Sequence, residues 1–281
     1  MKEIKMCVLL LLLMTLLIAC GKETPRSSPE GTASAPTTVQ TAPTQPDLTV
    51  PDMQLSTEIR PLPEQYTASE LAKVYWEQGI NFGGKDHLTY YISLPSVYPF
   101  SADALAVQQE IFGLFNDWFG NDLTTLAKEY AGKIRTLEMP ENGFFDSKLT
   151  NCFSYCAGAR NGVLSILIRK DIRDVPRSQY ICFWLDLETG YRLDASAASQ
   201  KYGTDAQTVQ QALEAYYRQM HSQIDPGLDF FQENLKKTVS DENVAACQLF
   251  ATEDGTLGIV TNIYTPGSAA KVEKLIMLEE T

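Results

Sequence analysis

Cysteine residues are the side chains in this sequence whose type and spacing could most readily do chemistry. Beyond the first fifty residues there are four, Cys152, Cys156, Cys182 and Cys247. Thiols form disulfides or bind zinc, and four cysteines in an exported protein allow two disulfides in three pairings. Cys152 and Cys156 lie on one predicted strand about 13 Å apart, too far to bond each other. Disulfides to Cys182 or Cys247, of undetermined pairing, and buried free thiols therefore both stay open.

Other groups that could catalyse a reaction or bind a metal give no recognisable pattern. A zinc site is not predicted, because C-x3-C followed by two single cysteines lacks the paired C-x2-C spacing of zinc knuckles. The two histidines, His87 and His221, stand outside any nucleophile motif, and we interpret both as structural, with His221 at a helix C-terminus where positive charge is favourable. With 35 acidic residues, carboxylate pairs arise by coincidence. The sequence therefore predicts no catalytic residue, no cofactor and no metal.

The first twenty residues carry signals of export. An apolar run from Met6 to Ala19, interrupted by Thr15, would form about 21 Å of helix, short of the ~30 Å hydrocarbon core of a bilayer. The run is therefore typical of a signal peptide rather than a membrane span. It ends in Leu17-Ile18-Ala19-Cys20-Gly21, which resembles the lipobox of bacterial lipoproteins. That resemblance implies cleavage before Cys20, a diacylglycerol on its thiol, and acylation (palmitate) or exposure of the new amino terminus. It also implies a cell-membrane anchor facing away from the cytoplasm.

Composition separates a tether from a folded part. Residues 20–62 are rich in Thr, Pro and Ser, and every aromatic residue lies from Tyr66 onward. A segment of this kind cannot bury enough apolar surface to fold, so we expect a disordered linker with a reach of roughly 35 Å. The formal charge of −12 becomes −13 once residues 1–19 are removed, because they carry two lysines and one glutamate. This acidic balance argues against nucleic acid as a partner.

Hydrophobic periodicity and capping residues predict the elements of the folded part. Its first section is expected to contain a helix to Trp76 capped by Thr67 or Ser69, a strand over 88–94 ended by Pro95, a helix capped by Ser101, and another capped by Asp122 after a break at 120–122. Its second section is expected to begin with strands over 152–157 and 163–168, joined by Asn161-Gly162, and strands over 179–187 and 191–193. A helix from Asp205 and a shorter helix with Leu228, Phe231 and Leu235 should follow. The section should end with strands over 247–251, 258–264 and 271–278.

Hairpins dominate this pattern, and helices do not alternate regularly with single strands. The prediction is therefore an α+β fold, an antiparallel sheet of hairpins with helices packed on one face. The expected divisions are a lipoprotein signal peptide at 1–19, a lipid-anchored linker at 20–62, an N-terminal helix and strand module at 63–140, and a C-terminal α+β domain at 141–281.

The order of the hairpin motifs resembles an exported bacterial domain of unknown function. The motifs are Gly162-Val163-Leu164-Ser165-Ile166, then Trp184-Leu185-Asp186-Leu187-Glu188-Thr189-Gly190-Tyr191-Arg192-Leu193, then, after a helix, Phe250-Ala251-Thr252-Glu253-Asp254-Gly255. They are similar to the domain of lysozyme-sensing anti-sigma factors, which also stands beside the catalytic domain of some peptidoglycan deacetylases. The resemblance covers roughly residues 85–281. Neither a sigma-binding segment nor a deacetylase domain is recognisable, so neither activity nor any catalytic residue is carried over.

These observations together predict a surface-anchored, non-enzymatic lipoprotein that binds or senses a protein or glycan of the cell envelope. Lysozyme-like proteins are the partners that the resemblance suggests, and the negative charge would speed encounter with a cationic envelope or host protein. Cell-wall glycan is the other partner class, and the membrane is contacted through the lipid on Cys20. The alternative function is a cell-wall modifying enzyme that uses a carboxylate pair.

The lipoprotein prediction has a direct chemical test. We expect the mature chain isolated from membranes to begin at Cys20 and to carry the mass of a diacylglycerol on that residue, as read by mass spectrometry of the N-terminal peptide. Cys20→Ser should abolish the added mass and release the protein from the membrane fraction. An unmodified N-terminus at another residue would contradict the prediction.

Overall fold

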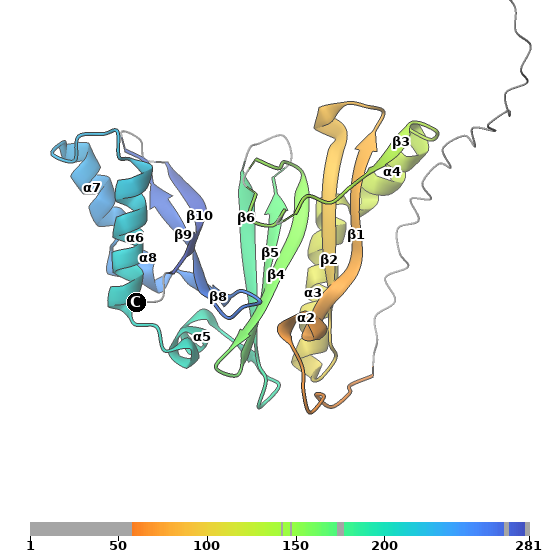
Figure 1. Cartoon of the computed structure of the whole chain (residues 1–281), viewed down its shortest axis with the longest axis horizontal. Helices are drawn as coiled ribbons and strands as arrows, with labels where there is room; N and C mark the ends of the chain where they lie inside the picture. The colour runs from red at the N-terminus through yellow and green to blue at the C-terminus, as the bar shows by residue number, and fades with distance from the viewer. Residues whose placement is uncertain (1–57, 142, 147, 173–176, 267–269, 279–281) are drawn as a thin grey trace, which may run out of the picture. The chain divides into compact units, whose positions relative to one another are not determined.

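The computed structural model describes residues 58–141, 143–146, 148–172, 177–266 and 270–278. Cys20 and the signal peptide lie outside the described residues, as does most of the predicted linker. The described residues belong to one compact unit spanning residues 45–281, with the predicted α+β content (Figure 1). No helix within the described ranges is both long and apolar enough to cross a membrane.

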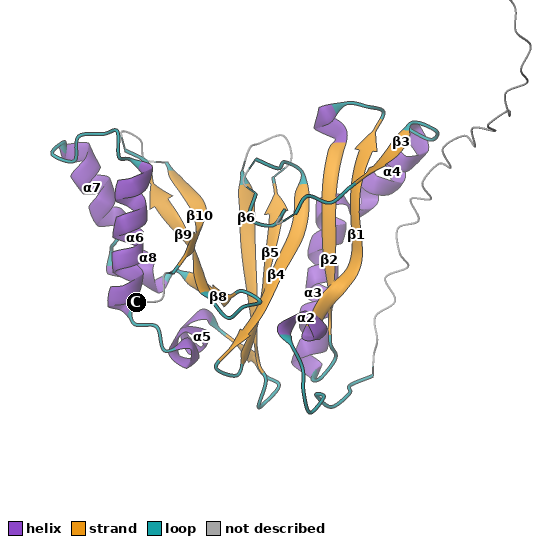
Figure 2. Ribbon diagram, in the orientation of Figure 1, coloured by secondary structure: helices purple, strands orange, loops and turns teal. Residues whose placement is uncertain are grey.

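A seven-stranded sheet is the centre of the fold (Figure 2). Its strand order is β3-β1-β2-β4-β5-β6-β7, and strands from both sides of the expected boundary at residue 140 join it and share one hydrophobic core. Neighbouring strands are antiparallel except β2 and β4, which are parallel. The strands are β1 Ala72–Phe82, β2 Thr89–Val97, β3 Ile134–Leu137, β4 Cys152–Arg160, β5 Val163–Asp171, β6 Ser178–Asp186 and β7 Arg192–Leu193.

The predicted Asn161-Gly162 hairpin is confirmed. Both turn residues have positive φ, 50° at Asn161 and 74° at Gly162, the combination that a type I′ turn requires. This turn sets the register of β4 on β5, which runs unbroken from Arg160↔Val163 to Phe153↔Lys170. Because side chains alternate along a strand, β4 presents Phe153 and Tyr155 to one face and Ser154 and Cys156 to the other.

One face of the sheet packs against a long helix. Ser101 caps it as predicted, accepting from Ala104 N at 3.0 Å, and the helix runs as α3 (Ala102–Phe115), a π-helical turn η3 (Asn116–Gly120) and α4 (Asn121–Glu129). The predicted break at 120–122 is wrong, because Gly120 and Asn121 keep right-handed helical dihedrals and the π turn places Phe119 in the core. Asp122 therefore lies in the first turn of α4 and does not cap it.

Two other element boundaries differ from the sequence prediction. The helix capped by Thr67 is α2 (Ala68–Leu71) and ends before Trp76, which lies in β1 and packs edge-on against Phe115 at 5.9 Å. Pro95 does not end its strand, because β2 continues to Val97. Pro95 is tolerated because its nitrogen faces the edge of β2 that turns away from β1, where no ladder bond is lost.

The opposite face of the sheet packs against a second layer, so helices are not confined to one face. That layer has its own hydrophobic core with Val163, Leu167 and Trp184 of the large sheet. A 3₁₀ turn, η2 (Asp86–Leu88), lies in the connection between β1 and β2 and is not part of this second layer. The second layer consists of α5 Ala195–Tyr202, α6 Ala206–Met220, α7 Asp229–Thr238, α8 Asp241–Ala245 and an antiparallel sheet of β8 Gln248–Ala251, β9 Leu257–Tyr264 and β10 Lys271–Met277.

Gly158 allows the two layers to approach closely. A Cβ at this position would lie 2.1 Å from Thr252 O and 2.3 Å from Ala251 O, both backbone atoms. Ser165 secures the same contact from β5, since its hydroxyl accepts from Ala251 N at 2.8 Å and lies within hydrogen-bond distance of the Gly158 and Ala251 carbonyls. Only glycine fits where β8 crosses β4.

We therefore expect Gly158→Ala to lower the free energy of unfolding by about 3 kcal/mol, the upper range for overpacking a core. Gly113→Ala is the matched control, because a Cβ there meets nothing within 4 Å on the exposed side of α3. That variant should be neutral or more stable by about 0.5–1 kcal/mol, the usual gain for alanine over glycine in a helix. Urea unfolding followed by circular dichroism measures both, and equal stability of the two variants would refute the close contact.

Candidate functional site

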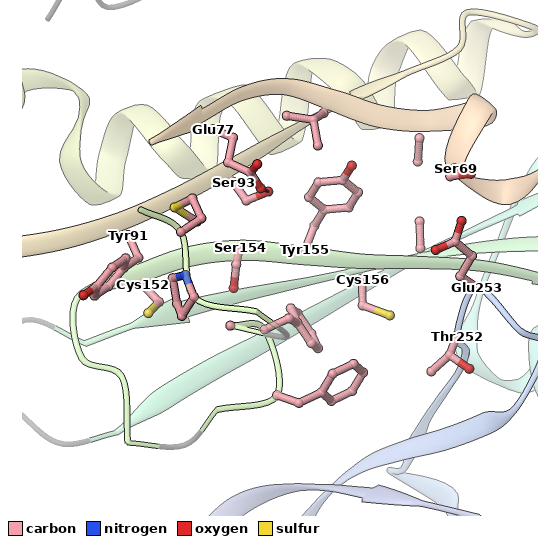
Figure 3. A pocket seen from close by; sticks show the side chains of 18 of the residues that line it. Ser69, Glu77, Tyr91, Ser93, Cys152, Ser154, Tyr155, Cys156, Thr252 and Glu253 are labelled. Carbon is pink, nitrogen blue, oxygen red and sulfur yellow. Dashed lines mark hydrogen bonds between the residues drawn. The ribbon is translucent and has the colours of Figure 1, made fainter. Parts of the chain in front are cut away.

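A cavity of about 860 Å³ opens between the β1–β2 hairpin and β4 (Figure 3). Its volume lies in the range of about 300–1,000 Å³ that is usual for ligand sites. β4 runs along the cavity with Ser154, Tyr155, Cys156 and Ala157 in its lining. The other walls come from the β1–β2 hairpin, from the loop before β4, and from the turn between β8 and β9.

Tyr155 extends from β4 toward the β1–β2 hairpin, on the side where Glu77 and Ser93 lie (Figure 3). Glu77 and Ser93 are directly paired across β1 and β2, and the Ser93 hydroxyl donates to Glu77 Oε1 at 3.2 Å. Burial, together with the negative charges of Glu77 and Glu253, raises the pKa of the Tyr155 phenol to about 12. The phenol is therefore a neutral hydrogen-bonding group between two acidic residues.

Ser154 and Cys156 extend from β4 in the opposite direction (Figure 3). Burial raises the pKa of the Cys156 thiol to about 12, with added contributions from the charges of Glu253 and Asp254. A thiol of that pKa is protonated at neutral pH and is a poor nucleophile. The Ser154 hydroxyl lines the cavity, is buried with the residue 6% exposed, and has no hydrogen-bond partner among the described residues. A buried hydroxyl without a partner is costly unless a ligand or water satisfies it.

The turn between β8 and β9 brings two acidic residues to the cavity. Glu253 and Asp254 both line it, between Thr252 and Thr256. Asp254 accepts hydrogen bonds from the Thr252 hydroxyl at 2.5 Å and from Thr256 N at 3.1 Å, and these hold its pKa below the usual range. The turn thus keeps a carboxylate ionised at the cavity mouth.

The loop that precedes β4 forms the apolar wall of the cavity, and a single buried arginine shapes it. Arg169 of β5 is 1% exposed and donates to the backbone carbonyls of the loop. The acceptors are Gly143 O at 3.2 Å, Phe144 O at 3.0 Å, Asp146 O at 2.7 Å and Leu149 O at 2.8 Å. One rigid guanidinium therefore fixes the positions of these four carbonyls, and Phe145 beside them is 46% exposed.

Asp171 balances the buried charge of Arg169. Its Oδ1 accepts from Arg169 Nε at 3.2 Å and from the Ser178 hydroxyl at 2.7 Å, and its Oδ2 accepts from Cys152 N at 3.0 Å. The Asp171 carbonyl accepts from Trp118 Nε1, in the π-helical turn of the long helix, at 2.7 Å. The ion pair therefore joins the loop, the start of β4 and the helix layer.

The cavity can bind positive charge. Glu77, Glu253 and Asp254 line it, and no lysine, arginine or histidine does so within the described ranges. Apolar side chains at Val74, Phe145 and Met277 add surface that is more than a third exposed. Carboxylates beside apolar surface suit a cationic group on a partly apolar carrier, such as a basic side chain of a protein. The lining of thiol, hydroxyl and carboxylate groups includes no cluster with the composition of a metal site, in the part of the chain that is described.

The candidate residues named from the sequence lie in different parts of the structure. All four cysteines, Cys152, Cys156, Cys182 and Cys247, carry free thiols, so none of the disulfides that the sequence allows is formed. Cys152 and Cys156 line the cavity, whereas Cys182 and Cys247 are buried in the second core. His87 lies in the 3₁₀ turn η2. His221 follows α6 as predicted but packs on Tyr217 at 4.7 Å, and burial lowers its pKa, so the expected cation at the helix end is not favoured.

Glu77, Glu253 and Arg169 are not among the site residues predicted from the sequence. The two glutamates lie far apart in the chain and only the fold joins them. Arg169 had a local signal, an arginine directly after the largely apolar run Val163–Ile168 and within the same strand. Comparisons with protein-family models, with curated proteins and with solved structures find no significant match to this chain.

We expect Arg169→Met to lower the free energy of unfolding by about 3–5 kcal/mol, because it leaves Asp171 buried without its partner and four loop carbonyls without a donor. Cleavage by a protease within residues 138–150 should become faster than in the parent chain. Arg218→Met on the exposed face of α6 is the control, where an i,i+4 pair with Glu214 should cost no more than about 0.5 kcal/mol. Unchanged stability of Arg169→Met would show that the loop does not depend on it.

Proposed function

We propose that this chain is a lipid-anchored, non-enzymatic binding module of the bacterial cell envelope, and that it captures a cationic protein in the cavity beside β4. The lipobox at Cys20 would attach it to the outer face of the cell membrane, with residues 20–62 as a tether. Lysozyme-like proteins are the partner class that the resemblance to sensing domains suggests. No family activity is transferred with that resemblance.

The observation that carries the proposal is the charge of the cavity. Three carboxylates line it without a basic residue in the described lining, so its potential favours a positive group. The pKa of Tyr155 and that of Cys156 are both raised in part by these carboxylates, which is the effect such a potential has on neutral acids. A partner cation would neutralise the charge of these carboxylates.

The exposed apolar residues favour a protein over a small cation. Val74 is 48%, Phe145 46% and Met277 38% exposed, and all three line the cavity. Protein interfaces concentrate their binding energy in aromatic and methionine side chains surrounded by polar groups. An inorganic cation would leave these residues in water, whereas a protein surface would bury them.

The carboxylate-pair enzyme remains the alternative. Glu77 and Glu253 are the acidic residues that line opposite sides of the cavity, with Tyr155 between them (Figure 3). A glycosidase or other wall-modifying enzyme of this kind would release fragments from purified peptidoglycan and would lose that activity with either carboxylate. The same variants therefore test both functions by different readouts.

We expect the full chain in detergent to bind hen egg lysozyme, used as a cationic probe, and to bind it more weakly as salt rises. The double variant Glu77→Gln, Glu253→Gln should raise Kd about tenfold or more at 50 mM salt, mainly by slowing association, and the difference should shrink at 500 mM. Surface plasmon resonance gives both rates.

Glu233→Gln is the control for that double variant, because Glu233 is exposed on α7 and pairs only locally with Lys237 among the described residues. It should bind like the parent chain. Absence of lysozyme binding at low salt would remove this partner, and equal weakening by the control and the double variant would remove the cavity as its site.

A further inference from the structure

The seven-stranded sheet is incompletely paired where the cavity opens. β2 and β4 pair only at Tyr91↔Cys152 and Ile92↔Phe153, although β2 continues to Val97 and β4 to Arg160. Beyond Phe153 the two strands separate, and the lining of the cavity comes from both sides of the separation (Figure 3). The sheet therefore contains an internal edge.

The backbone groups of β4 at this edge can be assigned from the strand geometry. Asn151 O accepts from Tyr91 N at 3.1 Å, so residue 151 faces β2. Backbone groups of alternate residues point in the same direction along a strand, which places the N–H and C=O of Tyr155 and Ala157 on that edge. Both residues line the cavity. No other strand pairs with this edge of β4 among the described residues.

The facing edge of β2 is satisfied differently. The side chain of Gln108, 4% exposed on α3, accepts from Val97 N and donates to Pro95 O at 3.3 Å. One amide thus binds two of the backbone groups of β2 that a neighbouring strand would otherwise bind. Nothing in the described chain takes this role for Tyr155 and Ala157 of β4. An unpaired strand edge is a template for another extended chain.

We propose that the cationic partner binds by adding an extended, basic segment of about four residues to the Tyr155–Ala157 edge of β4. This inference rests on the proposed function and specifies how the partner is held. The segment would exchange backbone hydrogen bonds with β4, as in other cases of strand addition. At about 3.3 Å per residue it would extend roughly 13 Å along the cavity.

The carboxylates that line the cavity determine which side chains such a segment would carry. Along an extended chain, side chains alternate in direction. The charge of Glu77 acts on Tyr155 on one side of β4, that of Asp254 acts on Cys156 on the other, and that of Glu253 acts on both. Lysine or arginine at successive positions would therefore meet a carboxylate in both directions. An acidic segment would meet repulsion in both.

The test uses the full chain and the blocked peptide acetyl-Thr-Lys-Lys-Lys-Lys-Thr-amide, with Kd measured by fluorescence anisotropy of a labelled form. Two modified peptides carry N-methyl groups on alternate residues, one set for each edge of the extended peptide. Both keep the charge and the side chains of the parent peptide. We expect one N-methylated peptide to bind at least tenfold more weakly and the other to bind within threefold of the parent.

Amide hydrogen exchange gives the readout on the protein. Saturating parent peptide should slow exchange at Tyr155 and Ala157 at least tenfold, while Leu167, in the middle of the sheet on β5, should change little. The weakly binding N-methylated peptide at the same concentration should not protect either amide. A glycan fragment or a second copy of this chain in the cavity would give no dependence on the methylated edge.

The outcomes separate this inference from the function on which it rests. If lysozyme binding depends on Glu77 and Glu253 but both N-methylated peptides bind as the parent does, the cationic partner stands and strand addition is wrong. If the parent peptide does not bind at low salt and Tyr155 and Ala157 stay unprotected under lysozyme, strand addition is wrong as well. If lysozyme binding is absent while the peptide shows the edge dependence, the binding mode stands and the partner is another basic protein.

Discussion

The buried ion pair of Arg169 and Asp171 is the interaction on which the rest of the site depends. A guanidinium removed from water needs a counter-ion and acceptors for its N–H groups, and burying it without them would cost several kcal/mol. Asp171 supplies the charge, and the loop before β4 supplies four carbonyls. Moving these carbonyls away would leave this cation unsatisfied. A side chain of β5 therefore sets the positions of four carbonyls in the wall of the cavity.

The helix layer and the second layer are each joined to the strands beside the cavity by a few specific contacts. Trp118 bonds the Asp171 carbonyl from the helix layer, whereas Gly158 and Ser165 admit β8 and its acidic turn from the second layer. Since Glu77 belongs to β1 and Glu253 to that turn, their separation is set by how each layer packs on β4. The charge of the cavity is thus a property of the packing rather than of any one segment.

Local signals in the sequence predicted the elements that local geometry determines. Asn161-Gly162 requires positive φ, and Ser101 and Asp205 each accept from a first-turn amide, so these turns and caps were predictable. Asp194 and Gly203 are equally good signals at the two ends of α5, a helix that the prediction does not include. At Trp76, Pro95 and Gly120 the structure differs from the prediction, because strand pairing, an edge position and a π turn override their local preferences. Glu77 and Glu253 could not be joined from sequence, because no pattern links residues so far apart.

Two residues on the β2 side of the gap, Pro95 and Gln108, explain why the sheet stays open beside β4. Pro95 has no N–H to offer β4, and Gln108 occupies the remaining groups of β2 at Pro95 and Val97. If β2 bonded β4 along its whole length, Gln108 would lose its partners inside the core and Tyr155 would have to leave the space it fills beside Glu77. Closure would therefore exchange satisfied backbone groups for a buried unsatisfied amide, which costs about 1–3 kcal/mol. An incoming strand meets no such penalty, because it bonds β4 alone and leaves Gln108 in place.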